Sequence, residues 1–220
     1  MLGNLILALD KELAPSTLSE ISKYIRRVKI GYPLILENFS YLDDVIKIHW
    51  DEIIFDLKLA DIDNTMVLIV SKLLNYGDSF ISHSFIGVEG ALDKLSEFLK
   101  QNNKNLYLVL SMSHKGWNDS FYPYLRGVAN KVDAKGFVVG ATKPNMIRIV
   151  RNDFKDKIII SPGIGAQGAN IGDAICNGAD YEIVGRTIYE AKDPIEQAKM
   201  LSHMQEVRID ECKGAENRQK

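Results

Sequence analysis

The amino-acid sequence predicts a single parallel (β/α)8 barrel, a fold of the α/β class. The chain has 220 residues, a length that accommodates one such barrel. It contains eight short runs rich in Ile, Val and Leu, most of them followed by a segment with helical periodicity. Runs that are apolar nearly throughout suit parallel strands, because both faces of such a sheet are buried.

The predicted elements alternate along the chain. The strands are expected at residues 5–9, 28–31, 53–58, 79–85, 106–112, 136–140, 157–161 and 181–185. The helices are expected at residues 15–26, 64–76, 88–102, 120–131, 143–152, 170–177 and 194–204. Several begin with a capping residue or Pro and end near Asn or Gly, as helices do. Residues 1–204 are therefore expected to form one domain, and the polar residues 205–220 a flexible tail.

Composition and charge exclude several classes of protein. Hydrophobic residues make up 46% and charged residues 25% of the chain, values typical of a globular protein with a sizeable core. The net charge of -2 favours neither nucleic acid nor a membrane surface as a partner, and no apolar run is long enough to span a membrane. The first residues lack a basic leader and end in Asp10, which indicates a first strand and a cytoplasmic protein. Cys176 and Cys212 lack metal spacing and do not form a disulfide scaffold.

An open doubly wound sheet is the alternative fold. Residues 163–168, GIGAQG, match a dinucleotide-binding fingerprint between a predicted strand and a predicted helix. Only one predicted strand follows, which is too few for a nucleotide-binding half. We therefore interpret these residues as a phosphate-binding loop late in a barrel, with a purely structural tight turn as the alternative.

Charged side chains collect where the predicted strands end, which is the face of a barrel that carries chemistry. They are Asp10, Lys29, Asp56, Lys58 and Asp61. Side chains alternate along a strand, so Asp56 and Lys58 point to the same face. Alone, such a pair indicates a structural ion pair. A barrel has no structural need for a whole ring of charges, however, so we interpret the ring as a functional site.

The other side of this face carries groups that suit a phosphate. Glycines with exposed amides follow the last two predicted strands, together with Gln167 and Arg186. Backbone amides and a guanidinium bind a dianion well. Two central lysines would repel a metal cation, and no His or acidic cluster has metal spacing. The pattern predicts a phosphorylated substrate and a proton transfer that needs no cofactor.

Six motifs, spread over nearly the whole chain, carry a resemblance to a known family. They are LALD (7–10), VKIGYP (28–33), DLKLADI (56–62) followed by Thr65, MSH (112–114), SPGIGAQG (161–168) and IVGR (183–186). In this order they closely resemble the orotidine 5'-monophosphate decarboxylase family, in its compact archaeal and bacterial form. The Asp-x-Lys-x-x-Asp element alone is shared with a wider suprafamily.

The resemblance implies an enzyme that converts orotidine 5'-monophosphate to UMP and CO₂, the last step of pyrimidine synthesis, without a cofactor. It implies that Lys58 protonates the carbanion formed at C6 and that Asp56 lies beside the departing carboxylate. Asp10 and Lys29 complete the charged network and contact the ribose. Asp61, a catalytic residue in this pattern, reaches the active site of the neighbouring subunit of a homodimer.

Further substrate contacts are implied by the same resemblance. The residues concerned are Ile62, Thr65, Ser113, Pro162, Gln167, Gly185 and Arg186. Ile62 and Thr65 act with Asp61 across the dimer, and Ser113 contacts the pyrimidine. Gln167, Gly185 and Arg186 bind the phosphate, and a loop from Pro162 to about residue 172 closes over the substrate.

One position departs from the family pattern, and two alternatives remain at this stage. Lys115 stands where a small residue or Pro is expected, so its loop is expected to take a different course. His83 and His114 are interpreted as hydrogen-bonded structural residues. A first alternative is a magnesium-dependent relative, such as 3-keto-L-gulonate 6-phosphate decarboxylase or hexulose-6-phosphate synthase, but these enzymes have a glutamate where this chain has Lys29. A second is a non-catalytic barrel that binds a phosphorylated metabolite.

Overall fold

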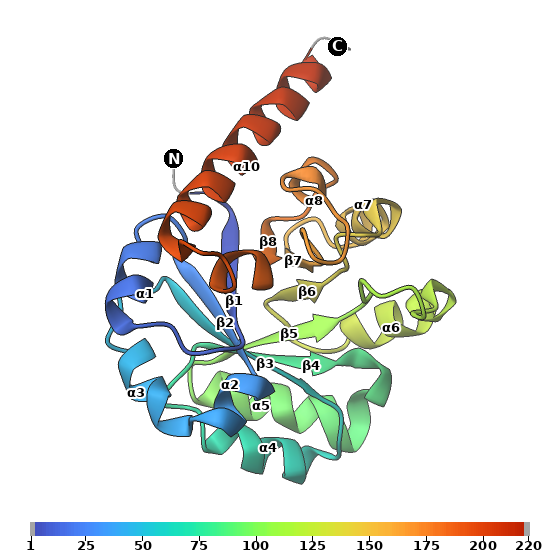
Figure 1. Cartoon of the computed structure of the whole chain (residues 1–220). Helices are drawn as coiled ribbons and strands as arrows, with labels where there is room; N and C mark the ends of the chain where they lie inside the picture. Colours follow the sequence, from blue (N-terminus) through green and yellow to red (C-terminus); the bar gives the residue numbers. More distant parts are fainter. Residues whose placement is uncertain (1–2, 218–220) are drawn as a thin grey trace.

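A closed barrel of eight parallel strands forms the centre of the molecule in a computed structural model, which describes residues 3–217 (Figure 1). Each strand pairs with its neighbours in chain order, and the eighth strand pairs with the first. The strands are β1 (Leu5–Leu9), β2 (Arg27–Gly31), β3 (Glu52–Leu59), β4 (Ser79–His83), β5 (Asn105–Val109), β6 (Gly136–Val138), β7 (Ile158–Pro162) and β8 (Tyr181–Val184). The predicted (β/α)8, or TIM, barrel is confirmed, and the open doubly wound sheet is wrong.

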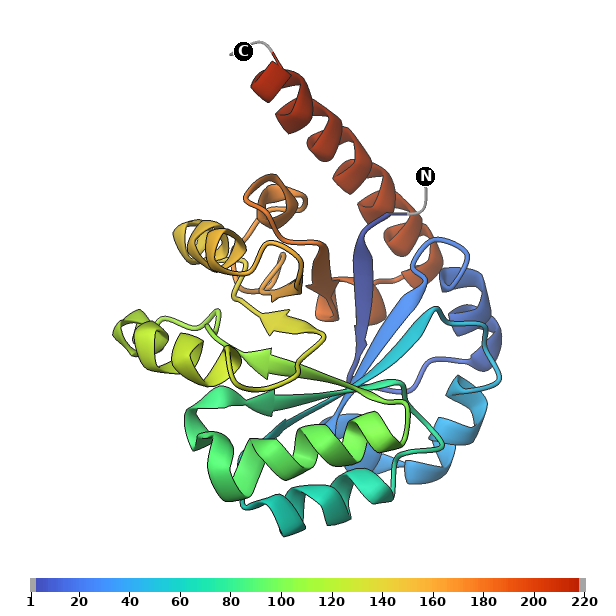
Figure 2. The same ribbon diagram turned by 180° about the vertical axis from the view of Figure 1, so that it is seen from behind.

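Helices surround the barrel (Figures 1 and 2). Those that correspond to predicted helices are α1 (Pro15–Ile21), α4 (Asp63–Ser71), α5 (Asp93–Gln101), α6 (Tyr122–Ala129), α7 (Pro144–Asp153), α8 (Asp173–Cys176) and α10 (Pro194–Asn217). The short helices α2 (Tyr32–Glu37), α3 (Leu42–Val45) and α9 (Arg186–Tyr189) were not expected. They have at most six residues each, which is too few to show a helical period in the sequence.

Alternation along the strands divides the apolar side chains into two cores. Ile54 belongs to the cluster inside the barrel, together with Ile6 and Ile183. The next residue, Phe55, belongs to the cluster between the strands and the helices. Both Ile54 and Phe55 are fully buried. Because both faces of the strands are covered, the strand sequences are apolar nearly throughout.

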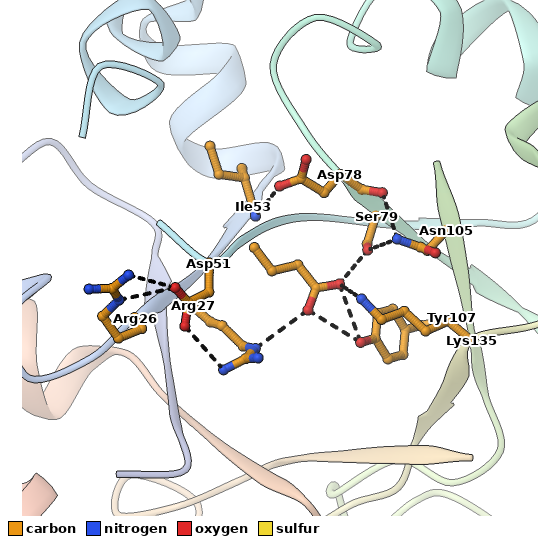
Figure 3. A network of polar contacts seen from close by, with 10 residues as sticks. Arg26, Arg27, Asp51, Ile53, Asp78, Ser79, Asn105, Tyr107 and Lys135 are labelled. Atoms are coloured by element: carbon orange, nitrogen blue, oxygen red, sulfur yellow. Dashed lines mark hydrogen bonds and ion pairs between the residues drawn. The ribbon is translucent and has the colours of Figure 1, made fainter. Parts of the chain in front are cut away.

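A polar network around the buried Glu52 closes the amino-terminal end of the barrel (Figure 3). The Glu52 carboxylate accepts hydrogen bonds from the hydroxyls of Ser79 and Tyr107, and from Lys135 Nζ at 2.7 Å. The Arg27 Nε atom lies 3.6 Å from the same carboxylate. A buried charge is costly unless it is paired, so these contacts let Glu52 lie there. The opposite end of the barrel is left for chemistry.

The C-terminal segment differs from the prediction of a flexible polar tail that begins at residue 205. Helix α10 continues without a break to Asn217 and extends beyond the barrel (Figure 2). Gln205, the first residue of the predicted tail, is fully buried and hydrogen-bonded to the backbone of Asn4. The predicted boundary at residue 204 therefore falls inside a helix, and residues 218–220 of that tail lie outside the described residues.

The two cysteines also behave differently from the expectation. Cys176, at the end of α8, forms a disulfide with Cys212 of α10, and their Cα atoms are 5.9 Å apart. The cysteines are 36 residues apart in the sequence, so only the packing of α8 against α10 brings them together. Among residues 3–217, no helix has the length and apolar composition that a membrane crossing requires.

Candidate active site

A pocket of about 250 Å³ opens at the carboxyl ends of the strands. It brings together residues from both halves of the predicted site. The predicted residues that line it are Asp10, Lys29, Asp56, Lys58, Ser113, Pro162, Gln167, Gly185 and Arg186. Four of the five charged residues predicted to form the ring, all except Asp61, therefore face one cavity together with the glycines, Gln167 and Arg186.

The centre of the pocket is the carboxylate of Asp56, which lies between two lysines. Lys29 Nζ is 2.9 Å from Asp56 Oδ2, and Lys58 forms an ion pair and a hydrogen bond with Asp56 Oδ1. The side chains of Asp56 and Lys29 are only 11% and 10% exposed. Such a buried arrangement of charges is stable only because the carboxylate and the ammonium groups satisfy one another.

Lys29 and Lys58 set the protonation state of Asp56, and Asp56 in turn affects that of Lys58. Burial raises the pKa of the Asp56 carboxyl, but the charges and hydrogen bonds of Lys29 and Lys58 outweigh burial and lower that pKa to about 2. Burial lowers the pKa of the Lys58 ammonium, and the Asp56 carboxylate opposes that shift. Asp56 is therefore a carboxylate at neutral pH, and it favours the protonated form of Lys58.

The backbone of β3 is irregular where it carries Lys58. Lys58 has a φ of +45°, in the left-handed region that residues with a side chain rarely adopt. The pairing of β3 with β4 shifts register between Phe55 and Leu59. A bulge of this kind re-aims a side chain, and here it accompanies the contact between Lys58 and Asp56. Backbone strain held by the surrounding structure is common at functional sites.

Asp10, at the end of β1, is positioned by residues that the sequence did not single out. The Tyr189 hydroxyl, on α9, donates a 3.4 Å hydrogen bond to Asp10 Oδ2. A Cβ atom at Gly31 would lie 3.3 Å from Asp10 Oδ1, so only a small residue leaves room there. Tyr189 follows Arg186 by three residues, one helical turn. This helical spacing from Arg186 was the only feature of the sequence that could have placed Tyr189 at the site. It was not recognised, because the short helix α9 was not predicted.

The end of the pocket at which the sequence predicts phosphate binding combines the loop after β7 with the start of α9. In the loop, the amide of Ala169 donates to Gly163 O at 3.2 Å, and the amide of Gly165 donates to Ala169 O at 2.9 Å. Gly163 has a φ of +116°, and a Cβ atom there would lie 3.0 Å from the Ser113 Cβ atom. Arg186 begins α9 and forms no ion pair within the described residues. Its guanidinium is therefore available for an anion.

Ser113, which the sequence placed on the pyrimidine, lines the pocket. The Thr142 hydroxyl donates a 2.7 Å hydrogen bond to the Ser113 carbonyl. The neighbouring candidate, Ser111, is buried and donates to Asp119 instead. Lys143 forms an ion pair with the same Asp119 at 2.7 Å. These contacts fix the loop after β5, and they separate the structural Ser111 from Ser113 at the site.

Both histidines near this loop lie outside the set of pocket-lining residues. Burial and the nearby charge of Lys58 lower the pKa of His83 to about 4, so His83 is neutral at pH 7. Its Nδ1 atom is buried and has no hydrogen-bond partner among the described residues, so the expected hydrogen bond is not present at that nitrogen. His83 and His114 both pack near the ring of Trp117. Lys115, the departure from the family pattern, is exposed.

Three predicted residues do not line the pocket of their own chain. Asp61 and Ile62 are exposed, Ile62 to 61%, and Thr65 lies in the first turns of α4. The Asp61 carboxylate accepts a hydrogen bond from the amide of Ile62. The structure therefore separates these residues from the Asp56 and Lys58 pair to which the sequence motif joins them.

Comparisons with known proteins agree with this geometry. The family model described as "Orotidine 5'-phosphate decarboxylase / HUMPS family" matches residues 3–201. A curated orotidine 5'-phosphate decarboxylase of Sulfurisphaera tokodaii is 76% identical over 213 residues, which are 97% of this chain and all of the relative. Its counterpart in Saccharolobus solfataricus is 44% identical over 220 residues, 99% of each protein.

Solved structures give the same result. The crystal structure of orotidine 5'-monophosphate decarboxylase from Sulfolobus solfataricus superposes with a TM-score of 0.90 at 44% identity, and the match covers 94% of this chain and 99% of that one. The enzyme from Methanocaldococcus jannaschii, complexed with the inhibitor BMP, gives a TM-score of 0.84 at 31% identity over 93% and 99% of the two chains. The chain therefore belongs to the orotidine 5'-phosphate decarboxylase / HUMPS family.

Proposed function

We propose that this chain decarboxylates orotidine 5'-monophosphate to UMP and CO₂, the final step of pyrimidine synthesis. The observation that carries the proposal is the buried Asp56 carboxylate between Lys29 and Lys58. It lies in one pocket with Arg186 and the other residues proposed to bind phosphate. Membership of the family and the 76% identical curated decarboxylase support the same activity.

In the proposed reaction, the bond between C6 and the carboxyl carbon breaks and CO₂ leaves. The electron pair stays on C6, and Lys58 Nζ donates the proton that forms the new C–H bond. Asp56 keeps Lys58 protonated and lies beside the departing carboxylate. A vinylic carbanion is unstable in water, so fixed charges in a site closed to solvent lower its free energy. Asp10 and Lys29 complete the network and contact the ribose.

The remaining pocket residues bind the substrate away from the reacting carbon. Ser113 contacts the pyrimidine, and Gln167, Gly185 and Arg186 bind the phosphate. Pro162 begins the loop that closes over the bound nucleotide. Binding energy from the remote phosphate drives this closure, which assembles the site for catalysis. The inhibitor complex of the Methanocaldococcus jannaschii relative supports the binding of a small molecule.

We place Asp61, Ile62 and Thr65 in the active site of a partner subunit, in a homodimer. Large apolar side chains that are exposed in the single chain support this arrangement. They follow β2, β3 and β4, and they include Leu36 at 80% exposure and Phe85. Asp61 and Ile62, which follow β3, are exposed as well. Exposed apolar surface of this kind is typical of a protein interface.

A magnesium-dependent sugar-phosphate enzyme is not favoured. The enzymes considered as this alternative have a glutamate where this chain has Lys29, and the curated relatives named above are orotidine 5'-phosphate decarboxylases. A non-catalytic barrel is not favoured either, since a binding protein has no use for a buried carboxylate such as Asp56 paired with a lysine on a left-handed backbone. A cytoplasmic location fits an enzyme of nucleotide synthesis. The net charge of -2 does not favour nucleic acid or a membrane surface as a partner.

The decisive experiment follows the absorbance of orotidine 5'-monophosphate after the purified protein is added in excess EDTA. We expect the pyrimidine absorbance to change as UMP forms, at an unchanged rate when Mg²⁺ replaces the chelator. Turnover that EDTA abolishes and Mg²⁺ restores would support the magnesium-dependent alternative. Tight binding of the nucleotide without turnover would support the non-catalytic barrel.

A further inference from the structure

A second buried carboxylate, Glu182, lies on β8 outside the active-site pocket. Glu182 is fully buried, and it alternates along β8 with Ile183, whose side chain belongs to the core inside the barrel. The Glu182 side chain therefore faces the helix layer. A carboxylate in such a position is costly unless several donors satisfy it. Its position on the strand that leads to Gly185 and Arg186 raises the question of its role.

The donors to Glu182 come from the end of the phosphate loop and from α10. The amide of Gly172 donates to Glu182 Oε2 at 2.7 Å, and the amide of Ala174 donates to Oε1 at 2.9 Å. Gln205 Nε2, on α10, donates to Oε2 at 2.8 Å. Gln205 in turn accepts a 2.7 Å hydrogen bond from the amide of Asn4, which precedes β1. One carboxylate thus joins β8, the loop end and α10.

Gly172 is the residue at which the phosphate loop enters α8. It has a φ of +83°, and a Cβ atom there would lie 2.5 Å from the Arg208 side chain. Two further links hold α8 against α10. Arg208 forms an ion pair with Asp173 at 3.1 Å, and the disulfide joins Cys176 to Cys212. The downstream end of the loop is therefore fixed by these contacts.

We propose that Glu182 is a positioning residue for substrate phosphate, which holds the Gly172 end of the loop at a fixed place relative to Arg186. The inference rests on the proposed function. Gln167 lies on the loop, whereas Gly185 and Arg186 follow Glu182 by three and four residues on the same chain segment. Phosphate binding requires Gln167 at a set separation from Gly185 and Arg186. Glu182 links the two chain segments that carry these residues. Glu182 itself contacts no substrate.

The variant that tests this is Glu182→Gln, which keeps the size of the side chain. An amide has a single oxygen, so its NH₂ group would face at least one of the present donors, Gly172 N, Ala174 N or Gln205 Nε2. The loss of a buried hydrogen bond leaves that donor unsatisfied and loosens the loop end. Gln205→Met is a second variant, which keeps both backbone hydrogen bonds to Glu182 and removes the Gln205 donor together with the hydrogen bonds between Gln205 and Asn4.

The measurement compares two substrates, orotidine 5'-monophosphate and orotidine, which lacks the phosphate. For Glu182→Gln we expect kcat/KM for orotidine 5'-monophosphate to fall about tenfold, because a lost buried hydrogen bond has that effect on an equilibrium. For orotidine we expect kcat/KM to change less than about twofold, since no phosphate contact contributes to it. Gln205→Met should shift the ratio of the two values in the same direction and by less.

The matched control is Glu52→Gln, which removes the charge of the buried carboxylate at the opposite end of the barrel. It should lower the melting temperature and leave the ratio unchanged, and all assays are run well below the melting temperature of each variant. An equal fall for both substrates, or an unchanged ratio, in Glu182→Gln would overturn the inference. A wild-type protein that does not convert orotidine 5'-monophosphate would instead refute the proposed function, which separates the two failures.

Discussion

Lys29 and Asp56, from the neighbouring strands β2 and β3, meet in a buried ion pair with Nζ and Oδ2 2.9 Å apart. Lys58 binds the other oxygen of the same carboxylate. One acid thus serves two lysines, and the net charge of this group of three is positive when all are ionised. A substrate that brings a carboxylate and a phosphate supplies the negative charge that the pocket lacks.

Replacement of Lys58 by Ala should abolish decarboxylation and preserve nucleotide binding. Lys58 is the proposed proton donor, whereas the residues proposed to bind the phosphate lie elsewhere in the pocket. We expect kcat to fall by about 10³-fold or more, the scale for loss of a positioned acid, while calorimetry shows UMP binding within about threefold of wild type. Lys47→Ala is the control, since Lys47 is exposed and, among residues 3–217, pairs only with Asp44. Near-normal turnover of Lys58→Ala would refute the role of Lys58.

The buried Asp56 should make stability depend on pH in acid. Its pKa in the folded protein is about 2, below the value of 3.8 for an unperturbed Asp. Its contribution to stability is therefore fully present above pH 3.8 and is lost as the pH falls through 2. A shift of this size corresponds to about 2 kcal/mol in the free energy of unfolding. Urea unfolding between pH 2 and pH 5 measures it, and Asp56→Asn should show a flatter pH dependence. An equally steep dependence in that variant would argue against Asp56 as the source.

Mixed dimers should reveal which subunit supplies Asp61. Lys58→Ala and Asp61→Ala should each be inactive alone. If Asp61 acts across the dimer, a mixed dimer contains one site with both native residues. Equal mixing of unfolded chains and refolding should then restore about one quarter of wild-type activity, from the statistics of a two-fold dimer. If Asp61 acts within its own chain, the mixture stays inactive. Sedimentation of each sample checks that dimers have formed.

The disulfide between Cys176 and Cys212 should contribute to stability. It closes a segment in which the cysteines are 36 residues apart. Such a link stabilises the folded chain by about 3 kcal/mol, which corresponds to a melting temperature about 10 °C higher. Reduction should lower the melting temperature of the wild type and have no effect on Cys176→Ser/Cys212→Ser. Equal melting temperatures with and without reductant, in protein shown to have no free thiols, would contradict this.

Disulfides are rare in cytosolic proteins of mesophiles but frequent inside hyperthermophilic archaea, so the disulfide is compatible with the proposed location.

The fold was predictable because it depends on local patterning. The predicted strands at residues 5–9 and 28–31 agree with β1 and β2 to within one residue. The predicted strand at residues 106–112 extends beyond β5, because the apolar residues Leu110 and Met112 follow Val109 outside the strand, and Leu110 is fully buried. The prediction of a flexible tail from residue 205 was wrong, because helix α10 continues to Asn217. A charged sequence suggests exposure, yet Gln205 is buried, and it forms hydrogen bonds with Glu182 and Asn4.

The charged residues of the pocket could likewise be predicted from the sequence, since polar residues at strand ends meet on one face of a barrel. Ser113 and Pro162 were expected only from the resemblance to the family. The contact between Asp56 and Lys58 also follows from alternation. The left-handed backbone of Lys58 does not, because it depends on the register shift between β3 and β4. Tyr189 was missed because its hydrogen bond to Asp10 joins residues 179 positions apart.

Apolar periodicity and strand-end chemistry in the sequence were enough to predict the barrel, the charged pair of Asp56 and Lys58, and the place of Gln167 and Arg186 in the same pocket. These features arise from the geometry of each strand and from the shared direction of parallel strands. The anchoring of the phosphate loop through Glu182, and the disulfide at Cys176, required the folded chain. They depend on α10 packing against α8, and no local pattern specifies which distant side chains meet there.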